Sequence, residues 1–107
     1  MAYIDTLVAL ADPTRRAIFE SLRGRPRTVG ELAAKQPVSR PAVSQHLRVL
    51  ESARLVRVEP QGNRRVYSIR RDGLEELKQY LDGFWSDALT AFAAELTRRK
   101  KAERKRT

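Results

Sequence analysis

Cysteine is absent from this chain, and its absence removes two kinds of chemistry. Disulfides and thiolate metal sites are excluded, and a single histidine leaves too few soft ligands for a conventional zinc site. No apolar run approaches the ~20 residues that span a bilayer. The N-terminal stretch MAYIDTLVAL carries an acid where a signal peptide has basic residues. We therefore expect a soluble, cytoplasmic protein with no membrane segment, no metal and no cofactor.

Catalytic groupings are also missing. The sequence contains no nucleophile paired with a base, no phosphate-binding loop and no cluster of metal ligands, so we do not expect an enzyme. At 107 residues with 41% hydrophobic content, the chain forms one domain with a small core. A dimer would ease the shortage of core.

Basic residues are concentrated in two blocks. Residues 23–71 carry a net charge of +9 and residues 98–107 a net charge of +6, whereas residues 72–97 between them carry −5. A surface without a charged partner more often mixes its signs, so this segregation indicates a polyanion, most simply nucleic acid. The tail RRKKAERKRT taken alone is equally well explained as a solubilising end.

Local patterns predict three helices in the first part of the chain. Ile4, Leu7 and Val8 recur at helical spacing and predict a short first helix. The Asp12-Pro13 pair is typical of an N-cap followed by proline at the first helical position, so a second helix begins there. Thr28 and Glu31 are spaced as a capping box and predict the start of a third, short helix.

The next helix, predicted over about 39–52, is the one that carries exposed polar groups. Ser39 is suited to cap it, and Pro41 falls in the first turn, where its missing N–H breaks no helical bond. Val43, Leu47 and Leu50 form its apolar stripe. After this helix, apolar and polar residues alternate with a period of two, as in a β-strand. Gly62-Asn63 then predicts the turn of a β-hairpin over about 55–70.

The last predicted helix runs over about 72–99 and has two adjacent apolar lines. This is more apolar surface than a small domain can cover, so we expect one line to meet a second copy of the chain. The alternative is that both lines are internal core. The expected dimer contacts come from the first and last helices: Ile4, Leu7, Leu77, Leu81, Phe84, Trp85, Ala88, Leu89 and Phe92.

The order of these elements is that of a winged helix-turn-helix, mainly α with a β-hairpin wing. A helix fits the major groove of DNA, and a basic hairpin beside it reaches the flanking backbone or minor groove. Ser39 is first a cap, and His46 borders the apolar stripe, where packing and a phosphate contact are equally good explanations. The candidate DNA contacts are Ser39, Arg40, Pro41, Ser44, Gln45, His46, Arg48, Asn63, Arg64 and Arg65.

Residues 7–69 closely resemble the ArsR/SmtB family of bacterial winged-helix repressors. The resemblance lies in the segments LADPTRRAI, TVGELA, SRPAVSQHLRVLESARLV and GNRRVYSI. It implies a homodimer built from the first and last helices, with two recognition helices on an inverted-repeat operator in double-stranded DNA. Such proteins usually repress transcription, often of their own operon. We expect a DNA-binding and dimerisation domain over 1–97 and, from the charge distribution, a basic tail over 98–107.

The sequence departs from the metal-sensing members of that family. Many of them carry a cysteine pair on the short helix before the recognition helix, and here that segment is VGELAAKQ. Others use Asp and His on the last helix, and residues 72–101 contain no histidine. The chain more closely resembles metal-independent members, in which an FW pair recurs near the middle of the last helix. The inducer stays open: a small ligand in the dimer interface, another protein, or none.

The alternative to a sequence-specific repressor is an architectural DNA-binding protein with little sequence preference. Such a protein needs lysines and apolar wedges, whereas Arg40, Ser44 and Gln45 are side chains that hydrogen-bond base edges. We therefore favour the sequence-specific regulator.

Overall fold

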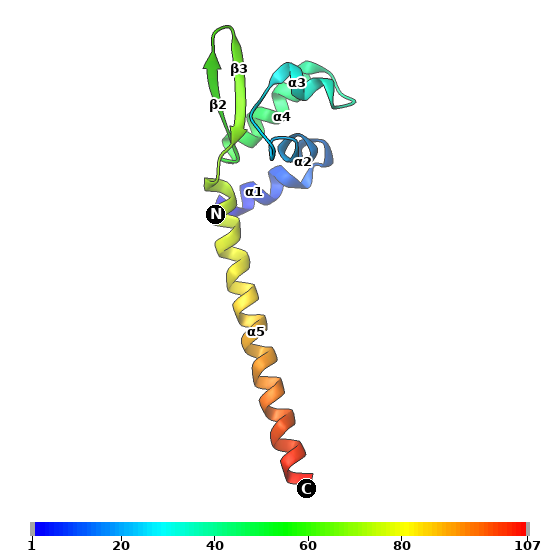
Figure 1. Ribbon diagram of the computed structural model, residues 1–107, viewed down its shortest axis with the longest axis vertical. Helices are drawn as coiled ribbons and strands as arrows, with labels where there is room; N and C mark the ends of the chain where they lie inside the picture. Colours follow the sequence, from blue (N-terminus) through cyan, green and yellow to red (C-terminus); the bar gives the residue numbers. More distant parts are fainter. Residues whose placement is uncertain (1, 107) are drawn as a thin grey trace. The chain divides into compact units, whose positions relative to one another are not determined.

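The computed structural model describes the backbone of residues 2–106 and confirms the predicted fold class (Figure 1). Five helices and three strands follow one another in the described chain. In order they are α1 (Ala2–Ala11), α2 (Pro13–Glu20), β1 (Arg27–Thr28), α3 (Val29–Ala34), α4 (Arg40–Ser52), β2 (Val56–Gln61), β3 (Arg64–Ile69) and α5 (Asp72–Arg106).

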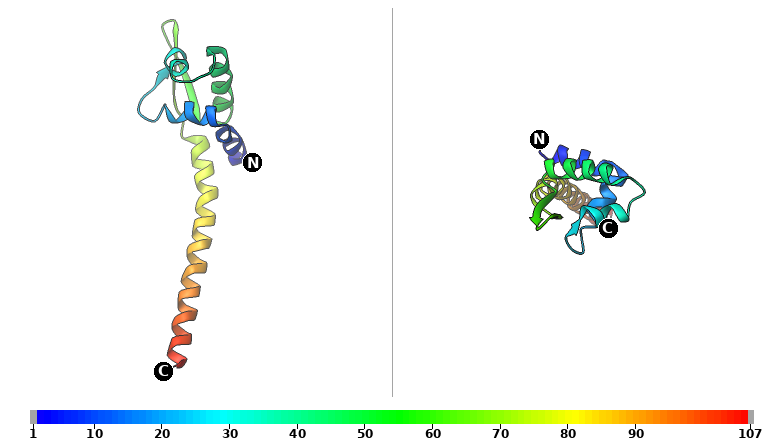
Figure 2. Two further views of the ribbon diagram at one scale, coloured as in Figure 1. Left: turned by 90° about the vertical axis from the view of Figure 1, so that its right-hand side faces the viewer. Right: turned by 90° about the horizontal axis from the view of Figure 1, so that it is seen from above.

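The chain divides into two compact units, one extending to Leu77 and one beginning at Lys78. The first unit holds α1 to α4, the three strands and the first turns of α5. The second consists of the rest of α5, which Figure 2 shows as an uninterrupted helix. Within residues 2–106, no helix combines the length and the apolarity needed to cross a membrane.

Short-range side-chain hydrogen bonds set the beginnings of α2 and α3. The carboxylate of Asp12 accepts from the backbone N–H of Arg15 at 2.9 Å, as an N-cap does. Thr28 and Glu31 form the predicted capping box, each side chain accepting from the other's backbone N–H at 3.2 and 3.1 Å. The guanidinium of Arg25, 2.8 Å from Glu31, and the N–H of Thr28 lower the pKa of Glu31 to about 2.

Helix α4 lies at the centre of the first unit, in contact with α1, α2, α3 and β2 (Figure 1). Its predicted apolar stripe, Val43, Leu47 and Leu50, is fully buried. At roughly 1.5–3 kcal/mol for each such side chain, this stripe is a principal source of the core's stability. It fixes which face of α4 turns outward. The stripe packs among further buried residues, which include Ile18, Phe19, Leu22, Leu32, Leu55, Val56 and Tyr67.

The sheet has three strands, one more than the hairpin that the sequence predicts. The two-residue strand β1 pairs antiparallel with β3, so the order is β1-β3-β2. A two-residue segment is too short to show an alternating pattern, which is why this strand was not predicted. Strand β2 is an edge strand, and this position lets it contain Pro60, which cannot donate to a ladder.

A hydrogen-bonded junction joins α1, the end of α4 and the start of α5. Thr6, the one buried polar residue among those whose side chains are described, donates from its hydroxyl to the carbonyl of Gly73 at 3.1 Å. The N–H of Gly73 donates to the carbonyl of Arg54 at 3.0 Å. Arg54 ends α4 in the left-handed region with φ 60°, and its guanidinium pairs with Glu76. The terminal helices of the first unit are thereby fixed to the end of α4.

Two expectations about the last helix need correction. It does not end near Arg99 but continues to Arg106. Neither of its apolar lines is buried beyond Leu77, although one was expected to pack internally: Leu81, Phe84, Trp85, Leu89, Phe92 and Leu96 are all exposed. The division at residue 97 into a domain and a tail stays a prediction.

Candidate nucleic-acid interface

The first turn of α4 presents polar side chains because its other side is anchored in the core. The hydroxyl of Ser39 accepts from the N–H of Ala42 at 3.3 Å, and Pro41 lies in the first turn, as predicted. With the stripe buried, Arg40 and Gln45 are exposed on the outer face and Ser44 is half-buried. Pro41 and Arg48 are also exposed.

The wing presents a second set of polar groups at its tip. Gln61 pairs with Arg64, which leaves Gly62 and Asn63 as a two-residue turn. Gly62 has φ +64° at the first central position, the conformation that a type II′ turn requires and that glycine adopts without strain. Arg64 and Arg65 follow immediately, and both are exposed.

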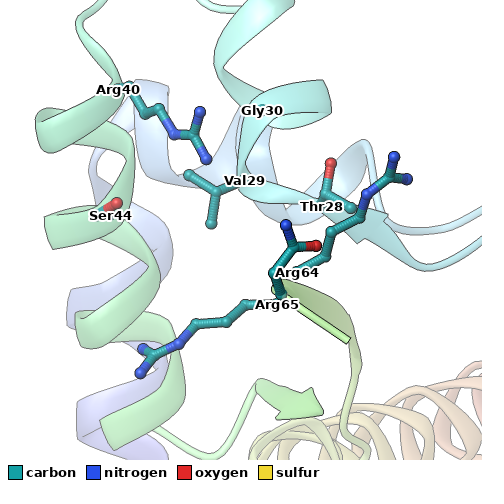
Figure 3. Close-up of a pocket in the computed structure, with 8 residues that line it drawn as sticks. Thr28, Val29, Gly30, Arg40, Ser44, Arg64 and Arg65 are labelled. Atoms are coloured by element: carbon teal, nitrogen blue, oxygen red, sulfur yellow. The ribbon is translucent and has the colours of Figure 1, made fainter. Parts of the chain in front are cut away.

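These two sets face a common groove of about 410 Å³ (Figure 3). Arg40 extends from α4 toward α3, where the guanidinium lies over Gly30; a Cβ there would be 4.0 Å from its Nη1 atom. Arg65 extends from the wing toward α4 (Figure 3). The groove is lined by Thr28, Val29, Gly30, Arg40, Ser44, Asn63, Arg64 and Arg65.

The cations of this face are unpartnered. Across residues 3–105, no side-chain hydrogen bond or ion pair is made by four arginines: Arg40, Arg48, Arg64 and Arg65. Arg15, in contrast, donates from Nε to the carbonyl of Ala9 at 2.6 Å and so satisfies the C-terminal end of α1. Free guanidinium groups with exposed donors are suited to phosphate and to the acceptor atoms of guanine.

His46 is half-buried and is not among the residues that line the groove. The N–H of Arg15 is the main cause that lowers the pKa of Asp12, and the charge of His46 contributes to the same shift. His46 therefore stays a candidate contact that lies outside the groove.

Three residues of the groove wall were not among the predicted contacts. Thr28, Val29 and Gly30 begin α3, and the sequence identifies Thr28 only as a cap. The pairing of β1 with β3 brings them to the wing, and no local pattern predicts that pairing. The cap at Thr28 was the only signal in the sequence that could have pointed to this segment.

No metal centre accompanies this face in the described part of the chain. No group of three or more His, Cys, Asp or Glu side chains there could hold an ion. Of the carboxylates on the last helix, Asp82 pairs with Lys78 at 3.0 Å and Glu95 pairs with Arg98 at 2.7 Å.

A buried-stripe helix with an outward polar face, beside a basic hairpin, defines the class of winged helix-turn-helix DNA-binding proteins. A family described as a helix-turn-helix domain matches residues 10–59. The chain is 60% identical over 85 residues to the HTH-type transcriptional regulator Rv2034 of Mycobacterium tuberculosis, covering 79% of each protein. It is 32% identical to the transcriptional repressor SdpR of Bacillus subtilis, over 71% of this chain and 84% of that protein.

Solved structures agree with these relatives. The crystal structure of a possible transcriptional regulator for arsenical resistance is 43% identical with a TM-score of 0.70, and the match covers 85% of this chain and 95% of that one. An ArsR family transcriptional regulator is 30% identical with a TM-score of 0.75, over 80% and 94% of the two chains. The chain belongs to the ArsR/SmtB family of winged helix-turn-helix transcriptional regulators, and is therefore a DNA-binding regulator and not an enzyme.

Proposed function

We propose that this chain is a homodimeric, sequence-specific repressor that binds an inverted-repeat operator and does not respond to metals. The observation that carries the proposal is the set of unpartnered side chains on α4 and the wing around one groove. Side chains that held the fold together would have intramolecular partners, as Arg15 has. The similarity to SdpR, a transcriptional repressor, supports repression as the outcome.

Base recognition falls to the outer face of α4. Arg40 and Arg48 suit the O6 and N7 atoms of guanine, and Gln45 suits adenine, so α4 in the major groove would distinguish base pairs. Arg64 and Arg65 suit the phosphates or the minor groove beside it. No lysine lines the groove among the described residues; its cations are the arginines Arg40, Arg64 and Arg65, whereas an architectural protein would need lysines.

Dimerisation is supported by the apolar side chains that the single chain leaves uncovered. Trp85 is 68% exposed and Phe92 62% exposed on α5, and Val8 is 60% exposed on α1. Monomeric soluble proteins rarely leave so many large apolar side chains in water, so a second copy is the natural occupant. The interface would include the candidates Ile4, Leu7, Leu77, Leu81, Phe84, Trp85, Ala88, Leu89 and Phe92.

Independence from metals is proposed from the ligand inventory. The chain has no cysteine and one histidine. That histidine, His46, is on α4 and not on the last helix, and it lies near Asp12, the N-cap of α2. Zinc, cadmium or arsenite at stoichiometric levels should therefore leave operator affinity unchanged, as measured by fluorescence anisotropy. A tenfold release of DNA would contradict this part of the proposal. A repressor of this kind acts in the cytoplasm, and control of its own gene is the simplest arrangement.

The decisive experiment is a footprint on the DNA upstream of the protein's own gene. A protected inverted repeat would support specificity, symmetry and self-control together. Gln45→Ala and Arg40→Ala should each cost roughly 1–3 kcal/mol on that operator and much less on random DNA. Lys35→Ala, which removes an exposed charge outside the groove, is the control.

Two outcomes would contradict the proposal. Equal losses on operator and random DNA would mean that Gln45 and Arg40 contact only the backbone, as in an architectural protein. A monomeric mass by light scattering at micromolar concentration would rule out the homodimer.

A further inference from the structure

The last part of α5 is a helical segment made almost entirely of charge. Residues 98–107 include seven basic residues and one acidic residue, and α5 continues through them to Arg106. The apolar lines of α5 end at Leu96, so no large apolar side chain in this extension is available for packing. We call residues 98–106 the basic extension. Its role must lie in its charge.

Three lysines of the basic extension are unpartnered. Arg98 and Arg99 pair with Glu95 at 2.7 and 3.2 Å. Lys100, Lys101 and Lys105 are exposed and make no hydrogen bond or ion pair with any side chain that the structure describes. Lys101 and Lys105 are one helical turn apart, where like charges repel each other. A polyanion would relieve that repulsion.

The three lysines share one side of α5. At 3.6 residues per turn, Lys100, Lys101 and Lys105 fall within an arc of about 140°. Glu103, the acid of this segment, falls outside that arc at about 300° from Lys100. Six exposed apolar residues of α5 occupy the opposite arc, between about 200° and 340° from Lys100: Leu81, Phe84, Trp85, Leu89, Phe92 and Leu96. Tyr80, also exposed, lies outside this arc at about 160°. A second copy that covers the apolar arc would therefore leave the lysines in water.

We propose that Lys100, Lys101 and Lys105 form a phosphate-binding surface that contacts double-stranded DNA without regard to base sequence. The proposal takes only the choice of DNA as the polyanion from the proposed function. The lysines span about 7.5 Å along the helix axis, and each DNA strand carries one phosphate per ~3.4 Å of its own axis. This length corresponds to about two phosphate spacings, so the three lysines can meet two or three phosphates of one strand.

The test is the salt dependence of binding to a fluorescent duplex of random sequence. Each phosphate contact contributes about 0.9 to the slope of log K against log salt concentration. We expect the triple variant K100A/K101A/K105A to lower the magnitude of this slope by about 2–3. Alanine keeps the helix, since it is the strongest helix former. The matched variant K100R/K101R/K105R keeps the charges and should keep the wild-type slope. A wild-type slope in the alanine variant would overturn the proposal.

Two further arms separate this surface from the recognition face. In a background of R40A/R64A/R65A, which lacks the groove arginines, adding K100A/K101A/K105A should still lower the magnitude of the salt slope. An unchanged salt slope in that background would mean that the lysines act only through operator binding, which contradicts the proposal. If wild type shows no preference for any operator but the alanine triple lowers the slope, the proposed repressor function fails while this surface stands. Lysine-dependent binding to vesicles containing phosphatidylserine, without binding to DNA, would overturn the choice of DNA.

Discussion

Replacing Gly73 by alanine tests the junction between the end of α4 and the start of α5. A Cβ at position 73 would lie 2.5 Å from the carbonyl oxygen of Ala53 and 3.1 Å from that of Arg54. Both neighbours are backbone atoms, so neither can rotate away as a flexible side chain would. The substitution must therefore push the first turn of α5 away from the end of α4.

Two effects of opposite sign decide the magnitude. Alanine is favoured over glycine inside a helix by ~0.5–1 kcal/mol. Against this, overpacking costs typically ~1–3 kcal/mol. The displacement also weakens the hydrogen bonds that Gly73 makes with Arg54 and Thr6, each worth about 1 kcal/mol. The clash wins, and Gly73→Ala should lower the free energy of unfolding by roughly 1–3 kcal/mol.

Gly83→Ala is the matched control for that substitution. Gly83 lies in the same helix with no atom within 4 Å of its ideal Cβ, and the position lies on the side of α5 away from the apolar lines. It should raise stability by ~0.5–1 kcal/mol. Urea unfolding followed by circular dichroism, at one fixed protein concentration because association adds to stability, measures both variants. A stabilised Gly73→Ala variant would refute the close approach of α4 and α5.

Three further predictions concern the first unit. Glu31→Gln should destabilise the protein at neutral pH. Because the pKa of Glu31 is about 2 in the folded protein against an ordinary 4.5, the loss of unfolding free energy relative to wild type should be complete above pH ~4.5 and should vanish as the pH falls toward 2. A constant difference between the acid-unfolding curves would contradict the Arg25 contact. Leu47→Ala, at a fully buried position, should cost ~2–5 kcal/mol in urea unfolding, and a loss below 1 would place Leu47 outside the core. Arg15→Ala should lower the free energy of unfolding by about 1–2 kcal/mol, since it removes hydrogen bonds to the carbonyls that end α1. Arg48→Ala should instead weaken DNA binding with little effect on unfolding. The reverse pattern would contradict the distinction between bonded and free arginines.

The helices of the first unit were predictable because their signals are local. A cap and its first turn lie within three residues, so Asp12, Thr28 and Ser39 could be identified without any knowledge of the fold. The stripe of Val43, Leu47 and Leu50 repeats within three turns and fixes both the helix and its buried face. The outer face of α4 follows from the same repeat.

Features that depend on distant parts of the chain were not predictable. Strand β1 exists because Arg27 and Thr28 pair with β3, almost forty residues later, and two residues cannot show a period. That pairing brings Thr28 and Gly30 into the groove wall. The extension of α5 was missed for another reason. Its residues have no apolar period, but Ala, Glu, Lys and Arg are strong helix formers, so α5 continues past its last apolar side chain.

Composition alone could not say which arginines bind DNA, because the same side chain has two uses in this fold. Arg15 and Arg16 reach the last carbonyls of α1, and Arg27 donates to the carbonyl of Ser21 at 2.7 Å. These guanidinium groups bind carbonyl oxygens at helix ends, where the backbone carbonyls lack partners within the helix. Among the described residues, the guanidinium groups of Arg40 and Arg65 donate to no carbonyl, and both line the groove. Within residues 23–71, Arg27 binds a backbone carbonyl, and Arg25, Arg54, Arg57 and Arg70 pair with carboxylates. The unpartnered subset, and not the net charge of +9, should therefore govern the salt dependence of binding.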